Sequence, residues 1–193
     1  MKSICVYCGA NVGARPSYTK TAQELGRLLA GEGLRLIYGG GHVGLMGVIA
    51  DATLGAGGEA VGVIPKALAD RELAYEGLTE LHVVSSMHER KTMMAELSDG
   101  FIAMPGGFGT FEEFCEILTW AQLGMHQKPS GLLNVAGYYD PLLALFDRAV
   151  SEGFVRNEHR AMVLTAERPE ALLQMMRDYR PPAVDKWIDL GET

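Results

Sequence analysis

The sequence predicts a single α/β domain, in which a doubly wound, mostly parallel sheet of about seven strands carries helices on both faces. Strand-like and helix-like runs alternate almost without exception along the chain, which favours a parallel sheet wrapped by helices. Glycine-rich loops follow several of the strand-like runs. In a doubly wound sheet, ligands bind at the carboxyl ends of the strands, where the strand order reverses. The predicted fold is therefore Rossmann-like, with its site in these loops.

Short apolar runs predict the strands, and they lie at 3–7, 34–38, 59–64, 80–84, 100–104, 131–135 and 161–164. Amphipathic segments between them predict helices near 17–31, 45–56, 87–98, 111–125, 141–152 and 169–179. Proline and glycine mark most of the helix ends, as expected for start and stop signals. No linker, repeat or low-complexity stretch interrupts this order.

The composition is typical of a globular protein in a reducing compartment. The chain has 193 residues, of which 48% are apolar, enough for one core. No apolar stretch reaches the ~18 residues of a membrane span, and the N-terminus lacks the apolar region of a secretory signal. The three cysteines are an odd number, which favours the cytoplasm over a disulfide framework.

Charge and residue spacing exclude several kinds of site. The net charge of −7 argues against nucleic-acid binding, which needs a basic surface. The five histidines are scattered without ligand spacing, so we expect no metal site. Cys5 and Cys8 form a CxxC, but the next helical pattern begins near Pro16, too far on to lower a thiol pKa. An anionic small ligand could still bind to backbone N–H groups.

Three glycine-rich loops follow predicted strands, at 8–13 (CGANVG), 38–47 (YGGGHVGLMG) and 105–113 (PGGFGTFEE). Glycine lets the backbone approach a phosphate closely while N–H groups point at it. Candidate phosphate contacts in the first two loops are Gly9, Asn11, Gly40 and Gly41.

Residues 39–44 also read as GxGxxG, the pattern of a nicotinamide dinucleotide site. That motif belongs after the first strand of a Rossmann unit, with an acidic residue ending the second strand. Here it follows the second strand, and no acidic residue ends the third. Tight turns in a compact α/β protein are the alternative interpretation.

The loop at 105–113 places three glycines, a hydroxyl and two carboxylates at the opening of one helix. Thr110 and Glu113 fit a capping box, in which the threonine caps the helix and the glutamate returns to an N–H. Acidic residues in a first helical turn also suit the helix dipole, so Glu112, Glu113 and Glu116 could be structural. On spacing alone, the structural and catalytic interpretations are equally open.

Arg90 is unusual in its predicted helix. Ser86 and Glu89 fit a capping box that starts a helix whose apolar stripe includes Arg90. Burial and the helix dipole both disfavour a cation there, so an anionic partner or ligand is implied. Arg90 could instead snorkel to solvent or pair with a core carboxylate. The neighbouring Lys91 would lie on a solvated face or make a second phosphate contact.

These motifs together resemble a known family. MHERK (87–91) followed by PGGFGTFEE (105–113) resembles the LOG family of cytokinin riboside 5′-monophosphate phosphoribohydrolases, whose pattern PGGxGTxxE is met in full. Further matching motifs run from CGANVG (8–13) to LLNVAGYYDPLL (132–143), and the overall similarity ends near Arg180. We therefore expect one domain over 1–180 and a C-terminal tail over 181–193. Ala10 departs from the serine frequent in the family, and Asn11 could supply the lost contact.

The resemblance implies roles for individual residues. Arg90 and Glu113 match the catalytic pair of the family. The matching substrate-binding positions are Glu72, Arg90, Lys91, Gly107, Phe108, Gly109, Thr110, Phe111, Glu112, Glu113 and Thr119. The implied reaction hydrolyses the bond between base and ribose in an N6-substituted AMP, or in AMP itself, and yields the free base and ribose 5-phosphate.

The expected partners are this small nucleotide and, by the same resemblance, a second copy in a homodimer, without cofactor, metal, nucleic acid or membrane. Similar proteins carry the label lysine decarboxylase, but no lysine is placed for a pyridoxal Schiff base. A non-catalytic nucleotide-binding or carrier module of the same fold is the main alternative function. A nicotinamide-dependent oxidoreductase rests only on GxGxxG.

Overall fold

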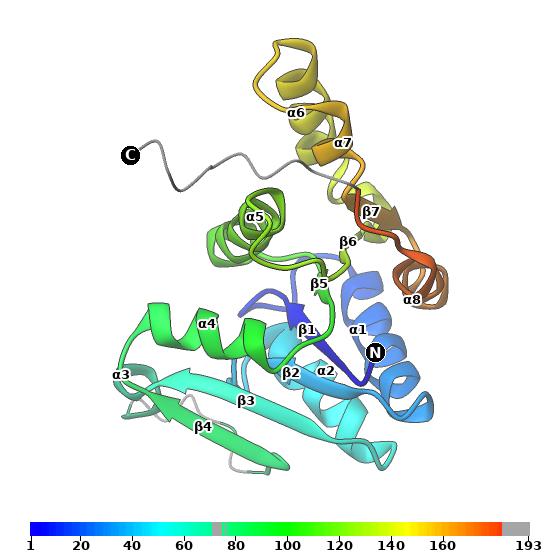
Figure 1. The fold of residues 1–193 in the computed structure, drawn as a ribbon. Helices are drawn as coiled ribbons and strands as arrows, with labels where there is room; N and C mark the ends of the chain where they lie inside the picture. Colours follow the sequence, from blue (N-terminus) through cyan, green and yellow to red (C-terminus); the bar gives the residue numbers. More distant parts are fainter. Residues whose placement is uncertain (71–74, 76, 183–193) are drawn as a thin grey trace.

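The computed structural model of the chain describes residues 1–70, 75 and 77–182, and these form a seven-stranded parallel sheet in the order β4-β3-β2-β1-β5-β6-β7 (Figure 1). Every predicted strand is present, with boundaries within two residues of those expected. The strands are β1 (Ser3–Tyr7), β2 (Arg35–Tyr38), β3 (Ala60–Pro65), β4 (Glu80–Val84), β5 (Phe101–Ala103), β6 (Ser130–Leu133) and β7 (Val163–Ala166).

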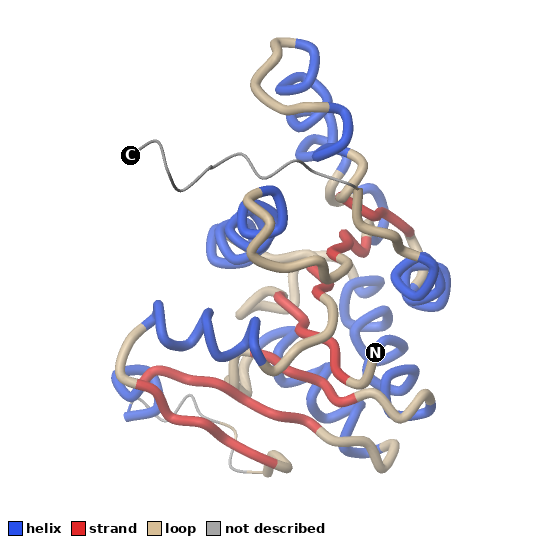
Figure 2. The backbone as a smooth tube through the Cα atoms, viewed as in Figure 1, coloured by secondary structure: helices blue, strands red, loops and turns tan. Residues whose placement is uncertain are grey.

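Helices cover both faces of this sheet, as predicted (Figure 2). They are α1 (Pro16–Gly31), α2 (Gly44–Gly55), α3 (Lys66–Leu68), α4 (Met87–Glu96), α5 (Phe108–Gln122), α6 (Asp140–Ser151), α7 (Asn157–Arg160) and α8 (Pro169–Asp178), with a short 3-10 turn, η2 (Val135–Gly137). On one face α1 packs against α2 and α8; on the other, α4 packs on β3 and β4, and α5 on β1 and β5. β1 alternates between the two cores, because Ile4 and Val6 face α1 while Cys5 and Tyr7 face α4 and α5.

The short elements α3, α7 and η2 were not expected from the sequence. Each is three or four residues long, too short for an apolar period to show. The start of α5 was also predicted wrongly, because the helix begins at Phe108 rather than near residue 111. Gly107 occupies the N-cap position, so Gly109 lies inside the first turn despite the low helix propensity of glycine. The expected tail begins at 181, and residues 183–193 lie outside the described part of the chain, so this boundary stays a prediction.

The strand order reverses between β1 and β5, and the three glycine-rich loops meet there. The N–H of Gly9 donates to the carbonyl of Pro105 at 3.1 Å, and the N–H of Leu45 donates to the carbonyl of Gly9 at 3.0 Å. Gly44 has a φ of +60°, and a Cβ on it would lie 2.2 Å from the carbonyl carbon of Ala10. Only glycine allows this approach. The fold therefore brings the predicted loops to one place.

Among the described residues, no helix is long and apolar enough to cross a membrane.

Candidate active site

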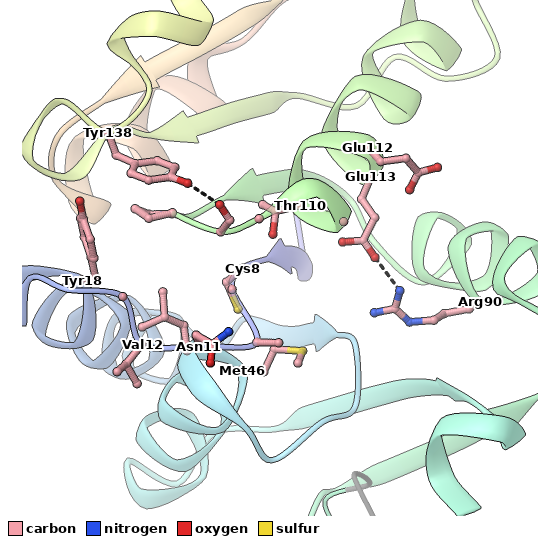
Figure 3. A pocket seen from close by; sticks show the side chains of 18 of the residues that line it. Cys8, Asn11, Val12, Tyr18, Met46, Arg90, Thr110, Glu112, Glu113 and Tyr138 are labelled. Atoms are coloured by element: carbon pink, nitrogen blue, oxygen red, sulfur yellow. Dashed lines mark hydrogen bonds and ion pairs between the residues drawn. The ribbon is translucent and has the colours of Figure 1, made fainter. Parts of the chain in front are cut away.

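A cavity of about 480 Å³ opens at this reversal of strand order, within the size range of small-molecule sites (Figure 3). The loops after β1 and β5, the starts of α1, α2, α4 and α5, and one residue that follows η2 supply its walls. The residues that line it are Cys8, Gly9, Ala10, Asn11, Val12, Gly13, Tyr18, Leu45, Met46, Met87, Arg90, Pro105, Gly106, Gly107, Gly109, Thr110, Glu112, Glu113 and Tyr138.

The N-terminus of α5 faces this cavity and is built to receive an anion. No side chain caps the helix, and its first intrahelical bond runs from the N–H of Phe111 to the carbonyl of Gly107, at 3.1 Å. The N–H groups before Phe111 therefore have no partner within the helix. Such N–H groups and the positive end of the helix dipole attract phosphates. Thr110 is the third helical residue and is buried, so the capping box with Glu113, one of the two interpretations that the spacing left open, does not form.

Arg90 reaches the cavity from α4 and pairs with Glu113 of α5 (Figure 3). Its Nη1 donates to Oε1 of Glu113 at 2.6 Å, and its Nε donates to the carbonyl of Val63 at 3.0 Å. Both side chains are nearly buried, with 11% and 10% of their surfaces exposed. Gly39 makes room for the guanidinium, since a Cβ there would lie 2.2 Å from Nη2 of Arg90. The predicted anionic partner of Arg90 is thus a carboxylate within the same cavity.

The start of α4 fixes this arginine in place. Ser86 is the N-cap, and its hydroxyl accepts the N–H of Glu89 at 3.1 Å, as predicted. The returning carboxylate of Glu89 accepts from the backbone N–H and hydroxyl of Ser85, at 2.7 and 2.6 Å, instead of from Ser86. Arg90 follows directly, one turn into a well-capped helix.

Burial has different consequences for the protonation of the Glu113 carboxyl and of the cysteine thiols. Burial raises the pKa of Glu113 above the ordinary value of a glutamate, while the charge and hydrogen bond of Arg90 oppose that rise. A carboxyl of this kind can accept or release a proton at a pH nearer neutrality. Burial also raises the pKa of Cys8 strongly, and that of Cys5 to about 12, so these thiols stay protonated. The CxxC therefore lacks the thiolate that redox chemistry requires.

Lys91 lies in an ion-pair cluster at the rim. Its side chain is 10% exposed, and its Nζ contacts Glu112 at 2.5 Å and Glu116 at 2.9 Å. It is thus neither on a solvated face nor free to meet a phosphate without leaving its carboxylates. The cluster ties α4 to α5 and so helps to hold the Arg90–Glu113 pair together.

The structure brings together many, but not all, of the residues singled out in the sequence. Gly9 and Asn11 line the cavity, whereas Gly40 and Gly41 are buried outside its lining. Phe108 is 91% exposed, and its side chain points away into solvent. Phe111 lies behind the loop, against Tyr138.

Two predicted substrate contacts lie elsewhere. Thr119 belongs to the exposed side of α5, where its hydroxyl donates to the carbonyl of Cys115 at 2.8 Å, and it lines a second cavity of about 160 Å³. Glu72 lies outside the described residues.

Sequence reasoning missed the aromatic and apolar wall, formed by Val12, Tyr18, Met46, Met87 and Tyr138. Tyr18 and Tyr138 meet edge to face, with ring centroids 5.8 Å apart. The only sequence signal was the pair of tyrosines at 138 and 139, soon after a predicted strand. Among the described residues, no group of three or more His, Cys, Asp or Glu side chains could hold a metal ion.

Known proteins resemble this chain closely. A family described as "Possible lysine decarboxylase" matches residues 46–176. The probable cytokinin riboside 5′-monophosphate phosphoribohydrolase LOGL1 of Oryza sativa subsp. japonica is 52% identical over 176 residues, which are 91% of this chain and 79% of that protein. The cytokinin riboside 5′-monophosphate phosphoribohydrolase LOG1 of Arabidopsis thaliana is 48% identical over 180 residues, 93% of this chain and 84% of that protein.

The fold has solved counterparts as well. The molybdenum cofactor binding protein of the phototrophic bacterium Rippkaea orientalis superposes with a TM-score of 0.70 at 26% identity, over 92% of this chain and 97% of that one. The sequence matches are much closer than this structural one, and the family match over residues 46–176 spans both MHERK (87–91) and PGGFGTFEE (105–113). The chain therefore belongs to the LOG family of cytokinin riboside 5′-monophosphate phosphoribohydrolases.

Proposed function

We propose that this protein hydrolyses the N-glycosidic bond of adenosine 5′-monophosphates, with an N6-substituted base or with adenine itself, to the free base and ribose 5-phosphate. The observation that carries the proposal is the buried ion pair of Arg90 and Glu113, which faces the same cavity as the uncapped N-terminus of α5. The relatives at about half identity bear the name of this activity.

The geometry suggests how the work is divided. The 5′-phosphate binds the N–H groups at the start of α5, between Gly107 and Thr110. Glu113, one helical turn further on, then lies beside the ribose. Breaking the glycosidic bond develops oxocarbenium character at C1′, which a nearby carboxylate stabilises. The same carboxylate can orient the water that adds to C1′, accept its proton and then return that proton to the nitrogen of the departing base, so that the carboxylate is regenerated.

Arg90 acts on this reaction chiefly through Glu113. Its guanidinium is anchored at Nε by a backbone carbonyl and at Nη1 by the carboxylate, so it fixes the direction in which the carboxylate points. Met46 and Met87 line the same cavity and offer an apolar surface for a base that carries a hydrocarbon substituent.

The alternative functions have weaker support. A carrier role is favoured only by the likeness to a molybdenum cofactor binding protein at 26% identity. A decarboxylase using pyridoxal phosphate would need a lysine facing the cavity, and among the described residues none lines it. The GxGxxG glycines at 39 and 44 serve close packing against Arg90 and Ala10.

We also propose that the protein is a cytoplasmic homodimer. Leu145 and Phe154 are 61% and 84% exposed, on α6 and just after it, beside the second cavity that holds Thr119. Exposed apolar groups of this kind are common at subunit interfaces. A second copy seated there would explain how Thr119 could serve a substrate site, since it lies apart from the cavity of its own chain. The three cysteines are free, which suits a reducing compartment.

Two experiments test these proposals. The purified protein is incubated with a panel of nucleoside 5′-monophosphates and the free base is assayed; no release from any adenosine monophosphate would overturn the proposed activity. Light scattering after gel filtration tests the dimer, which Phe154→Glu should convert to a monomer. A monomeric unaltered protein at micromolar concentration would overturn the assembly.

A further inference from the structure

In the loop that precedes α5, four consecutive carbonyl groups each accept a hydrogen bond. The carbonyl of Met104 accepts the hydroxyl of Tyr139 at 2.6 Å, and that of Pro105 accepts the N–H of Gly9 at 3.1 Å. The carbonyl of Gly106 accepts the hydroxyl of Tyr138 (Figure 3), and that of Gly107 accepts the first helical N–H. Carbonyl oxygens carry negative partial charge and repel an anion. With every one of them held by a donor, the loop presents N–H groups to the cavity.

Tyr138 holds the peptide group of this loop that could flip most easily. The peptide between Gly106 and Gly107 joins two residues without a Cβ, so it meets the least steric resistance to flipping. In a trans peptide the C=O and the following N–H point in opposite directions. While Tyr138 holds the carbonyl of Gly106, the N–H of Gly107 points away from that ring. A flipped peptide would turn the carbonyl toward the place where a phosphate binds.

The tyrosine itself is held firmly. Its ring stacks with Phe111 at 6.4 Å between centroids and meets Tyr18 and Tyr139 edge to face, at 5.8 and 5.1 Å. The preceding loop is braced by Asn134, whose side chain accepts the N–H of Tyr139 at 2.7 Å and donates to Asp140 at 2.7 Å. The hydroxyl of Tyr138 therefore has a fixed position, as is needed to hold the 106–107 peptide in one orientation.

We propose that Tyr138 is a positioning residue, which locks the 106–107 peptide with its N–H available to the phosphate of the substrate. The inference deepens the proposed function and rests on it for the identity of the anion. Tyr139 has a different task, because its hydroxyl satisfies a fully buried carbonyl next to β5 and supports the fold.

The test compares three tyrosine-to-phenylalanine variants by calorimetric titration with inorganic phosphate and with AMP. Tyr138→Phe should weaken both by on the order of tenfold and raise KM for AMP more than it lowers kcat, with little change in Tm, because water can reach this half-buried hydroxyl bond. Tyr139→Phe should lower Tm and affect phosphate affinity less. Tyr38→Phe is the control, since that fully buried hydroxyl has no hydrogen-bond partner among the described residues, and it should leave phosphate affinity unchanged.

The outcomes separate the inference from the proposed function. Phosphate affinity in Tyr138→Phe equal to that of the unaltered protein overturns the inference, whether or not AMP is hydrolysed. A fall in affinity only as large as in Tyr139→Phe, together with an equal loss of Tm, would mean a structural role and also overturns it. If the unaltered protein binds phosphate but releases no base from any nucleotide, the proposed activity fails while the positioning role is still decided by the titrations.

Discussion

Glu113→Gln is the sharpest test of the active site. The change removes the negative charge of the carboxylate and keeps its size and one oxygen that can accept the hydrogen bond from Arg90. If the charge stabilises an oxocarbenium ion and orients water, activity should fall by on the order of 100-fold or more, which corresponds to about 2.7 kcal/mol in the barrier. If Glu113 serves only the helix, activity should persist.

Glu113→Gln should also lower the thermal stability of the fold. Glu113 and Arg90 form a nearly buried pair, so the amide leaves a guanidinium without a counter-charge. Two effects reduce the resulting loss of folding stability. The hydrogen bond survives, and the cost of ionising a buried carboxyl, which grows as the pH rises above its ordinary pKa, disappears. We expect a net loss of about 1–2 kcal/mol, or a fall in Tm of about 2–8 °C in a chain of this length.

The assay is release of free base from AMP at 25 °C, alongside thermal melts of both proteins. Glu116→Gln is the control: it lies one turn further along α5 and pairs with Lys91 at the rim, outside the cavity lining. It should keep activity within a few-fold, as expected for a partly exposed ion pair. An active Glu113→Gln protein would show that a structural carboxylate has been mistaken for a catalyst.

Three further predictions follow from the same site. The phosphate should be indispensable, so AMP or its N6-substituted analogues should be turned over and adenosine hardly at all; similar kcat/KM values for nucleotide and nucleoside would refute the phosphate site. The purified protein should show no absorbance band beyond the aromatic region that is released on denaturation, and such a band would revive the oxidoreductase or decarboxylase. Because Arg90 opposes the raised pKa of Glu113, Arg90→Met should shift the acidic limb of the kcat/KM profile to higher pH; a shift to lower pH would show that the limb belongs to another group.

The strands and most helices could be read from the sequence, because a strand buried on both faces appears as a short apolar run between punctuating residues. The start of α5 could not. The capping rule favoured Thr110 as the N-cap, yet the chain uses Gly107, whose missing side chain leaves the first N–H groups open to a ligand. Function here overrides the local preference, which is where sequence rules are expected to fail.

The sequence indicated the individual residues Arg90 and Glu113, but it did not predict that they form an ion pair with each other. In the sequence, Arg90 was recognisable as a site residue because it is a charge on an apolar stripe, and Glu113 because it is a carboxylate near a glycine turn. Tyr18 and Tyr138 in the cavity wall carried no such conflict, since a tyrosine in an amphipathic helix or in a loop is ordinary. The role of Tyr138 depends on which carbonyl its hydroxyl reaches, and that is set by tertiary structure alone.

The pairing itself follows from the order of the strands, which periodicity does not contain. β4 is the edge strand beyond β3, and the next strand in the chain, β5, lies beside β1 near the centre. The connection must therefore recross the sheet, and α4 makes that crossing over β3, where the carbonyl of Val63 receives Arg90. Only this return path brings the start of α4 beside α5, so that the guanidinium meets Glu113. A shorter path between neighbouring strands would leave both charges buried without partners, at a cost of several kcal/mol each. The reversal of strand order thus creates the cleft and also brings together the ion pair that the proposed chemistry needs.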